Sequence, residues 1–209
     1  MHLTPDAVVH RPHLAIDVAR VATYWSDLEL HFGIAYTYLV GERDKDAFAA
    51  YYALHDWHKR KKMFDKEALD RGLPGPLKAA AHALYEEFQP LAALRNSVVH
   101  GAWAYSPEHE LSLFLAQPRE LGLNIVRALR SVGKVVVSPE RYTSLSVDLS
   151  PKTYAEYRHE DFEEIIAKIC AMRLKIIEFE NAIGKFAVDR MANAAFQTTL
   201  SRANSDGIK

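Results

Sequence analysis

The sequence has very little cysteine and almost no net charge. Cys170 is the only cysteine among 209 residues, so no disulfide can form within one chain. This usage is typical of a reducing compartment, and we expect the cytoplasm. Basic and acidic residues number 26 and 27, so the chain as a whole has no positive charge with which to attract nucleic acid. Any contact with RNA must therefore come from a local basic patch.

Long apolar runs and several catalytic motifs are also missing. No apolar stretch is long enough to cross a bilayer, and residues 1–11 lack the basic and apolar segments of a secretory signal. There is no glycine-rich phosphate loop and no nucleophile elbow. The pairs His10 with His13 and His55 with His58 have a spacing that can share a metal, but no third ligand is indicated. We predict no membrane contact, no metal and no cofactor.

Apolar residues at helical spacing are the most frequent pattern in the sequence. Residues 12–40 place apolar side chains at steps of three and four, which predicts one long amphipathic helix ending before Gly41. A second pattern begins after Asp44 or Asp46, which can cap a helix, and continues to about Arg71. We expect an interruption of this second helix near Asp56.

Two further helices follow from the same periodicity. The third runs from about Leu77 to His100, with a kink or short break at Pro90 and Gly101 as a left-handed cap. The last long helix begins between Tyr154 and Glu160 and extends to about Phe196. The polar residues 197–209 are expected to form a mobile tail.

The segment between the third and last long helices has a different pattern. Residues 102–105 and 111–115 predict a β-hairpin, and residues 135–137 and 143–147 predict two more short strands. We therefore predict a mainly α fold: a four- or five-helix bundle with a small antiparallel β insertion at about 102–150. Residues 1–209 are expected to form a single domain, because this length suits one core.

The most reactive side chains gather at the predicted end of the third helix. Arg95 is a permanent cation, Asn96 is an amide, and His100 can take or give a proton near neutral pH. Asn96 and His100 are four residues apart and share one helix face. Arg95 lies roughly 140° round the helix from His100, so we expect the two side chains to flank a groove. An arginine and a histidine so placed can bind a phosphate and transfer a proton.

This stretch resembles a motif of the HEPN superfamily, the higher eukaryotes and prokaryotes nucleotide-binding domains. Arg95-Asn96-Ser97-Val98-Val99-His100 matches that family's Arg-x(4–6)-His pattern, including the polar residue after the arginine. Trp25-Ser26-Asp27-Leu28-Glu29 also resembles segments of bacterial HEPN-like proteins, and the likeness covers the helices, about two thirds of the chain. The resemblance implies a helical bundle, a homodimer with both motifs in one cleft, and metal-independent cleavage of RNA. Arg95 would bind the scissile phosphate, His100 would transfer protons, and Asn96 would orient one of them.

Two other groups of residues are candidates for supporting roles. Glu29 lies beside the apolar stripe of the first helix, where a carboxylate needs a partner. It can orient Arg95 within the site or simply neutralise it. Lys59, Arg60, Lys61 and Lys62 form a basic cluster next to Trp57 that can follow an RNA backbone, or else form a solvated helix face.

Two functions follow as hypotheses. The first is a metal-independent endoribonuclease of HEPN type, acting as a homodimer in the manner of a toxin or defence effector, with an antitoxin or regulatory protein as a further partner. The second is a non-catalytic binding or scaffold protein of the same fold, in which Arg95, Asn96 and His100 stabilise the bundle or a dimer seam.

Overall fold

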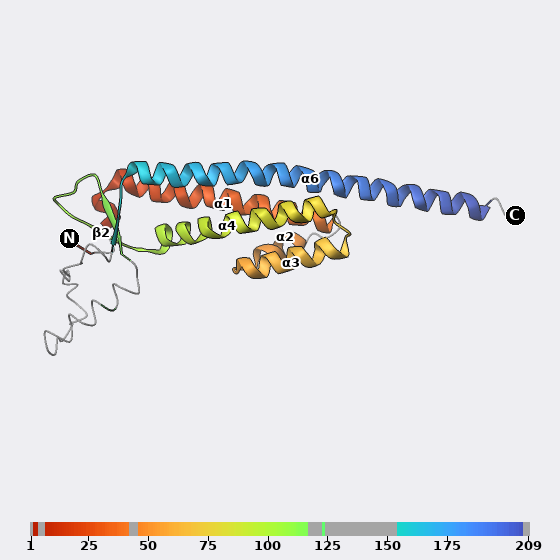
Figure 1. Cartoon of the computed structure of the whole chain (residues 1–209), viewed down its shortest axis with the longest axis horizontal. Coiled ribbons are helices and arrows are strands. Elements are labelled where there is room, and N and C mark those ends of the chain that lie inside the picture. Colours follow the sequence, from red (N-terminus) through yellow and green to blue (C-terminus); the bar gives the residue numbers. More distant parts are fainter. Residues whose placement is uncertain (1, 4–6, 42–45, 117–122, 124–153, 207–209) are drawn as a thin grey trace. The chain divides into compact units, whose positions relative to one another are not determined.

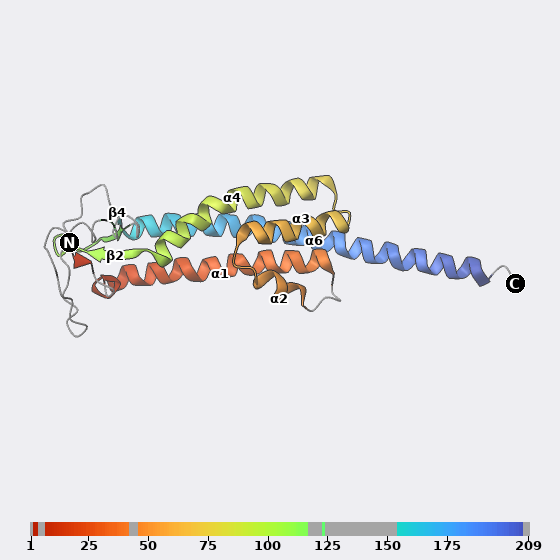
Figure 2. The same cartoon turned by 90° about the horizontal axis from the view of Figure 1, so that it is seen from below.

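The computed structural model describes residues 2–3, 7–41, 46–116, 123 and 154–206. In this part of the chain the protein is a helical bundle with a small antiparallel sheet between helices, which confirms the predicted fold class. Figures 1 and 2 show the helices and strands along the chain. The chain divides into two compact units. Unit 1 comprises Met1–Trp25 and Pro90–Ile169, and unit 2 comprises Ser26–Gln89 and Cys170–Lys209. That the whole chain acts as one domain stays a prediction.

The first helix, α1, spans Pro12–Val40, as its apolar spacing predicts. Its inward face is fully buried, with the side chains of Leu14, Val21, Trp25, Leu28, Phe32, Tyr36 and Leu39. Gly41 ends the helix with a φ of +111°, and its N–H donates to the carbonyl of Thr37 at 2.9 Å. A left-handed residue at this position favours glycine, which has no Cβ to clash.

The second predicted helix is interrupted where the sequence indicates. A short 3-10 turn, η1 (Ala7–His10), precedes α1, and α2 (Ala47–Tyr52) and α3 (Trp57–Asp70) follow it. Asp56 caps α3, because its carboxylate accepts hydrogen bonds from the N–H groups of His58 at 2.8 Å and Lys59 at 3.3 Å. These bonds also lower the pKa of Asp56 below its ordinary value, because they favour the charged carboxylate.

The helix α4 spans Gly75–His100 and continues through Pro90, so the predicted alternative of a break there is wrong. The predicted left-handed cap at Gly101 is also wrong, because the positive-φ glycines in the described part of the chain are Gly41 and Gly72. Gly101 is needed for space instead. A Cβ on it would overlap the carbonyl oxygen of Ser97 and the Cδ1 of Leu115.

The small sheet belongs to unit 1. Its strands are β1 (His2–Leu3), β2 (Ala102–Tyr105), β3 (Leu113–Ala116) and β4 (Tyr154–Tyr157), all antiparallel and in sequence order. The β2–β3 pair is the predicted hairpin, with Trp103 opposite Leu115. The strands β1 and β4 were not predicted, because so few residues give only a weak alternating pattern and neither segment adjoins a turn that indicates a hairpin. The strands predicted at 135–137 and 143–147 lie outside the described residues.

The last helix, α6, spans His159–Asp206 and begins within the predicted range. It continues beyond the predicted end at Phe196, so the segment expected to be a tail is helical as far as Asp206. Residues 191–199 are exposed. Intrinsic propensity therefore supports this part of the helix better than burial does, and its alanines are the strongest helix formers. No helix among the described residues has the length and apolarity needed to span a membrane.

Each unit has its own aromatic core. In unit 1 the Trp103 ring packs edge-on against Tyr157, with centroids 5.5 Å apart, and its Nε1 donates to the carbonyl of Val98 at 3.1 Å. In unit 2 the rings of Phe32 and Phe88 meet edge-on at 5.1 Å. Such packing is specific as well as apolar, because aromatic pairs prefer these geometries. This hydrogen bond connects β2 to the last turn of α4, which contains His100, and Arg95 lies in the turn before it.

Candidate functional site

The structure brings Arg95, Asn96 and His100 together at the end of α4. An Nη1 N–H of Arg95 donates to Oδ1 of Asn96 at 2.9 Å, and the same Nη1 lies 3.3 Å from Nε2 of His100. Asn96 and His100 are exposed and Arg95 is partly exposed, so this end of α4 presents the three polar groups at the surface. The expected separation of Arg95 and His100 across a groove is wrong, because the long arginine side chain reaches round the helix.

The contact between Arg95 and His100 also indicates the tautomer of the imidazole. Arginine carries only donors, so Nε2 must accept this hydrogen bond. This hydrogen bond requires the tautomer that carries its proton on Nδ1. A neutral Nε2 with a lone pair is the form in which histidine can take a proton from a hydroxyl group.

Packing within unit 1 restrains the guanidinium of Arg95. Its Cζ lies 5.9 Å from the centre of the Trp25 ring, within the range of a cation–π interaction. Its Nε is buried and has no hydrogen-bond acceptor among the described residues. The Nη1 end of the side chain, by contrast, reaches the exposed Asn96 and His100. This geometry places the positively charged guanidinium of Arg95 beside a proton acceptor, Nε2 of His100, at the surface.

Glu29 lies in unit 2, where it forms an ion pair with Arg60. Its Oε1 is 3.6 Å from Nη1 of Arg60, and the two side chains are 21% and 5% exposed. The carboxylate beside the α1 core therefore has a counter-charge that the sequence analysis did not identify. A role for Glu29 in orienting or neutralising Arg95 stays a prediction.

The four basic residues predicted as an RNA-binding cluster do not share one exposed surface. Arg60 is buried and donates through Nε to the carbonyl of Leu54 at 2.5 Å. Lys61 pairs with Asp65 at 2.8 Å. Lys59 and Lys62 are exposed. The inclusion of Arg60 in an RNA surface is therefore wrong, because on an amphipathic helix four consecutive residues cannot all face solvent.

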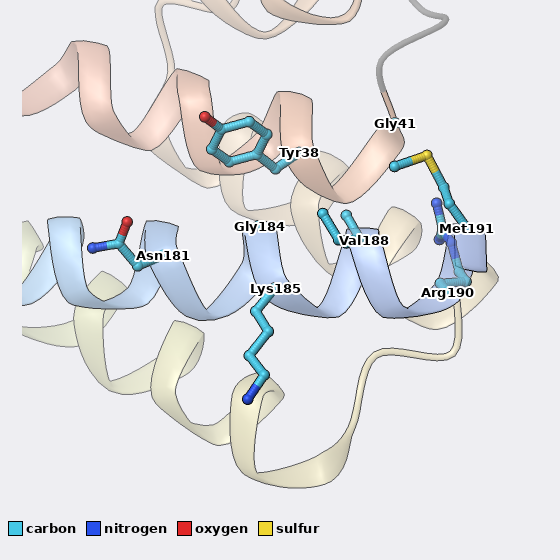
Figure 3. Close-up of a pocket in the computed structure, with 9 residues that line it drawn as sticks. Tyr38, Gly41, Asn181, Gly184, Lys185, Val188, Arg190 and Met191 are labelled. Atoms are coloured by element: carbon cyan, nitrogen blue, oxygen red, sulfur yellow. The ribbon is translucent and has the colours of Figure 1, made fainter. Parts of the chain in front are cut away.

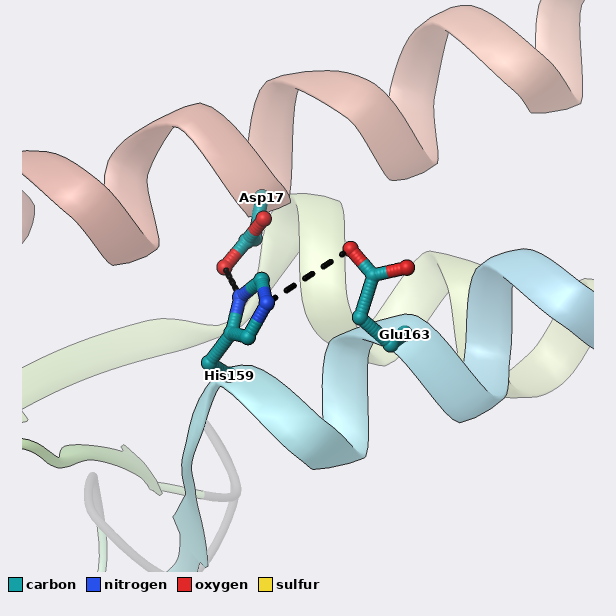
Figure 4. A group of neighbouring side chains, drawn as sticks. All are labelled: Asp17, His159 and Glu163. Atoms are coloured by element: carbon teal, nitrogen blue, oxygen red, sulfur yellow. Dashed lines mark hydrogen bonds and ion pairs between the residues drawn. The ribbon is translucent and has the colours of Figure 1, made fainter.

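A second polar cluster, in unit 1, was missed by the sequence analysis (Figure 4). Asp17 of α1 is 3% exposed, and its Oδ2 lies 2.7 Å from Nδ1 of His159 at the start of α6. Arg20 donates to Asp17 at 3.1 Å and also to Glu163. Nε2 of His159 lies 3.8 Å from Glu163. An aspartate in the apolar stripe of residues 12–40 was the available signal, since a buried carboxylate requires partners.

The ligand atoms of Asp17, His159 and Glu163 lie within 4.8 Å of one another, which is close enough to consider a metal. The guanidinium of Arg20 already binds both carboxylates. A metal ion would have to displace this cation, and Nδ1 of His159 is engaged by Asp17. The arrangement is better suited to holding the first turn of α6 against α1.

We expect the stabilising contribution of His159 to decrease as the pH rises. Its hydrogen bond to Asp17, and then the charge of Asp17, raise the pKa of His159 above its ordinary value of 6.5. A raised pKa in the folded state means that the stabilisation is complete below the unfolded pKa and is lost as the pH rises through the folded pKa. His159→Gln should therefore destabilise the protein most at acidic pH, with a difference that shrinks as the pH rises from the ordinary pKa of 6.5 through the raised pKa of the folded state.

Urea denaturation of both proteins across this pH range measures the effect. His82→Gln is the control, because His82 is an exposed histidine that lies 3.9 Å from Glu86. A difference between wild type and His159→Gln that stays constant or grows with pH would contradict the assignment.

No family model, no curated protein and no solved structure matches the chain.

Proposed function

We propose that the chain is a metal-independent endoribonuclease with Arg95, Asn96 and His100 as its catalytic residues. One observation carries the proposal: Nε2 of His100 lies 3.3 Å from Nη1 of Arg95 at an accessible helix end. Cleavage of RNA by its own 2′-hydroxyl needs a proton acceptor beside a cation that binds the phosphate. The HEPN-like spacing of the three residues supports the same reaction.

In the proposed reaction, a phosphate oxygen of RNA replaces Nε2 of His100 as the acceptor for Arg95. The lone pair of Nε2 then takes the proton of the 2′-hydroxyl, and O2′ attacks the phosphorus. Arg95 stabilises the added negative charge, and Asn96, bonded to Arg95 at 2.9 Å, holds the guanidinium in place. The P–O5′ bond breaks, leaving a 2′,3′-cyclic phosphate and a 5′-hydroxyl.

The leaving O5′ must gain a proton, and a second His100 is the proposed donor. This assignment requires a homodimer in which both motifs meet in one cleft, as the HEPN resemblance implies. One imidazole then acts as the base and the other, protonated, acts as the acid. A toxin or defence role in the cytoplasm, restrained by an antitoxin or regulatory protein, is the corresponding biological proposal.

Cleavage of labelled single-stranded RNA by the pure protein in EDTA tests this function. We expect wild type to cleave, His100→Ala to lose about 10²–10⁴-fold in rate, and Arg95→Ala about 10²–10³-fold. RNA with a 2′-deoxy sugar at the scissile position should resist cleavage, because the nucleophile is missing. His82→Ala is the matched control, since His82 is an exposed histidine on the same helix. An inactive wild type, or equal rates in all variants, would exclude the proposal.

A non-catalytic binding or scaffold protein is the second candidate function. The packing of Arg95 against Trp25 and the burial of its Nε favour this reading. Wild type would then leave RNA intact, and Arg95→Ala would lower the unfolding temperature by several degrees. Retention of the wild-type unfolding temperature together with loss of RNA cleavage would exclude this alternative.

A further inference from the structure

Unit 2 contains a pocket of about 290 Å³ that neither candidate function uses (Figure 3). It lies between the C-terminal end of α1, which contributes Tyr38 and Gly41, and the part of α6 from Asn181 to Met191. The side chains of Val188 and Met191 line it, and in Figure 3 Val188 points toward α1. The walls are therefore aromatic or aliphatic over most of their extent.

Two glycines leave space at the wall of this pocket. A Cβ on Gly184 would lie 3.6 Å from Cδ2 of Tyr38, so glycine leaves this edge of the tyrosine ring uncovered. Gly41 has a φ of +111°, and a Cβ on it would lie 3.7 Å from Nη2 of Arg190. The absence of side chains at both positions therefore leaves space beside the Tyr38 ring and beside the guanidinium of Arg190.

Arg190 supplies the buried polar group of the pocket, and the more exposed Asn181 and Lys185 also belong to its lining. Its Nη1 is buried and has no hydrogen-bond acceptor among the described residues. Its Cζ lies 5.7 Å from the centre of the Phe186 ring, which restrains the guanidinium. A buried hydrogen-bond donor without an acceptor lowers the stability of the folded protein. The planar guanidinium of an arginine pairs best with a planar anion that accepts two parallel hydrogen bonds. The charged residues among the described lining are Arg190 and Lys185, both cations.

We propose that this pocket binds a small organic carboxylate. The carboxylate would pair with Arg190, and the apolar body of the ligand would lie against Tyr38, Val188 and Met191. The volume is close to the lower end of the range for ligand pockets, which favours a compact molecule over a nucleotide. Inorganic phosphate is less suitable, because its additional oxygens would face apolar walls. Lys185 lines the pocket but extends away from Tyr38, so it contributes little to this recognition (Figure 3).

Phenylacetate is the probe for this proposal, and 2-phenylethanol is its neutral analogue of similar shape. Isothermal titration of the full chain should show binding of phenylacetate, with an affinity at least about tenfold higher than that of 2-phenylethanol or inorganic phosphate. Arg190→Gln should weaken phenylacetate binding about tenfold. Lys185→Gln is the matched control, because it removes a neighbouring cation. It should leave the affinity for phenylacetate unchanged.

The comparison of the two probes uses wild-type protein, so it holds even if Arg190→Gln does not fold. Gly184→Leu should also abolish phenylacetate binding, because the added side chain would cover this edge of the Tyr38 ring. Equal binding of phenylacetate and 2-phenylethanol would overturn the proposal. So would the absence of binding at roughly millimolar phenylacetate, or an equal effect of Lys185→Gln and Arg190→Gln.

Discussion

Replacing Arg60 with leucine is expected to lower the free energy of unfolding by about 3–5 kcal/mol, because it removes one partner of a buried ion pair. Arg60 is only 4% exposed. Glu29, its partner, is also largely covered and would lose its counter-charge in the variant. An unpaired carboxylate in such a position costs far more than a surface ion pair contributes.

Backbone and aromatic contacts of Arg60 add to this loss. Its Nε and Nη2 donate to the carbonyl groups of Leu54 and Tyr52, in the connection between α2 and α3. Its Cζ lies 4.6 Å from the centre of the Trp57 ring and 5.5 Å from that of Tyr51. Leucine can occupy part of this volume but can satisfy neither carbonyl.

Chemical denaturation of the purified variants measures this effect. Lys62→Leu is the matched control, because Lys62 is exposed on the same helix and its loss should change stability by less than about 0.5 kcal/mol. The stability of Arg60→Lys should lie between those of Arg60→Leu and Lys62→Leu, because lysine keeps the positive charge but lacks the planar guanidinium. If Arg60→Leu and Lys62→Leu unfold at the same urea concentration, Arg60 does not hold unit 2 together.

Gly101→Ala should destabilise the protein by about 2–3 kcal/mol, although it adds a single methyl group. The new Cβ would overlap the carbonyl oxygen of Ser97, which is backbone, and the Cδ1 of Leu115 in β3. The leucine can rotate away, but Ser97 belongs to the last turn of α4. To accept the methyl group, the backbone at Gly101 must shift relative to the last turn of α4, and Leu115 must move as well.

Under the proposed function, this shift should also lower RNA cleavage, because His100 precedes Gly101 and Arg95 lies in the same helix end. Gly75→Ala is the control, since a Cβ there meets no atom within 4 Å and alanine favours helix. Denaturation and RNA cleavage measured on both variants test the two effects. Wild-type stability in Gly101→Ala would show that the helix end and β3 do not pack as closely as described.

The sequence by itself determined the long helices. A stripe of apolar residues at steps of three and four over residues 12–40 can be buried only as a helix, and α1 has those bounds. The same periodicity placed the interruption at Asp56 and the start of α6. Local chemistry also located Arg95, Asn96 and His100 near a helix end, because Gly101 and the strand pattern follow at once.

Only the tertiary structure decided which polar groups meet. Periodicity gives the face of a helix, but it does not say which carboxylate is opposite which cation. Glu29 therefore was matched in sequence to Arg95, whereas the structure pairs it with Arg60. Asp17 and His159 are 142 positions apart, so no local pattern in the sequence predicts their contact. Gly101 is also close to Leu115 of β3, a neighbour that only the packing of the sheet against the helix end supplies.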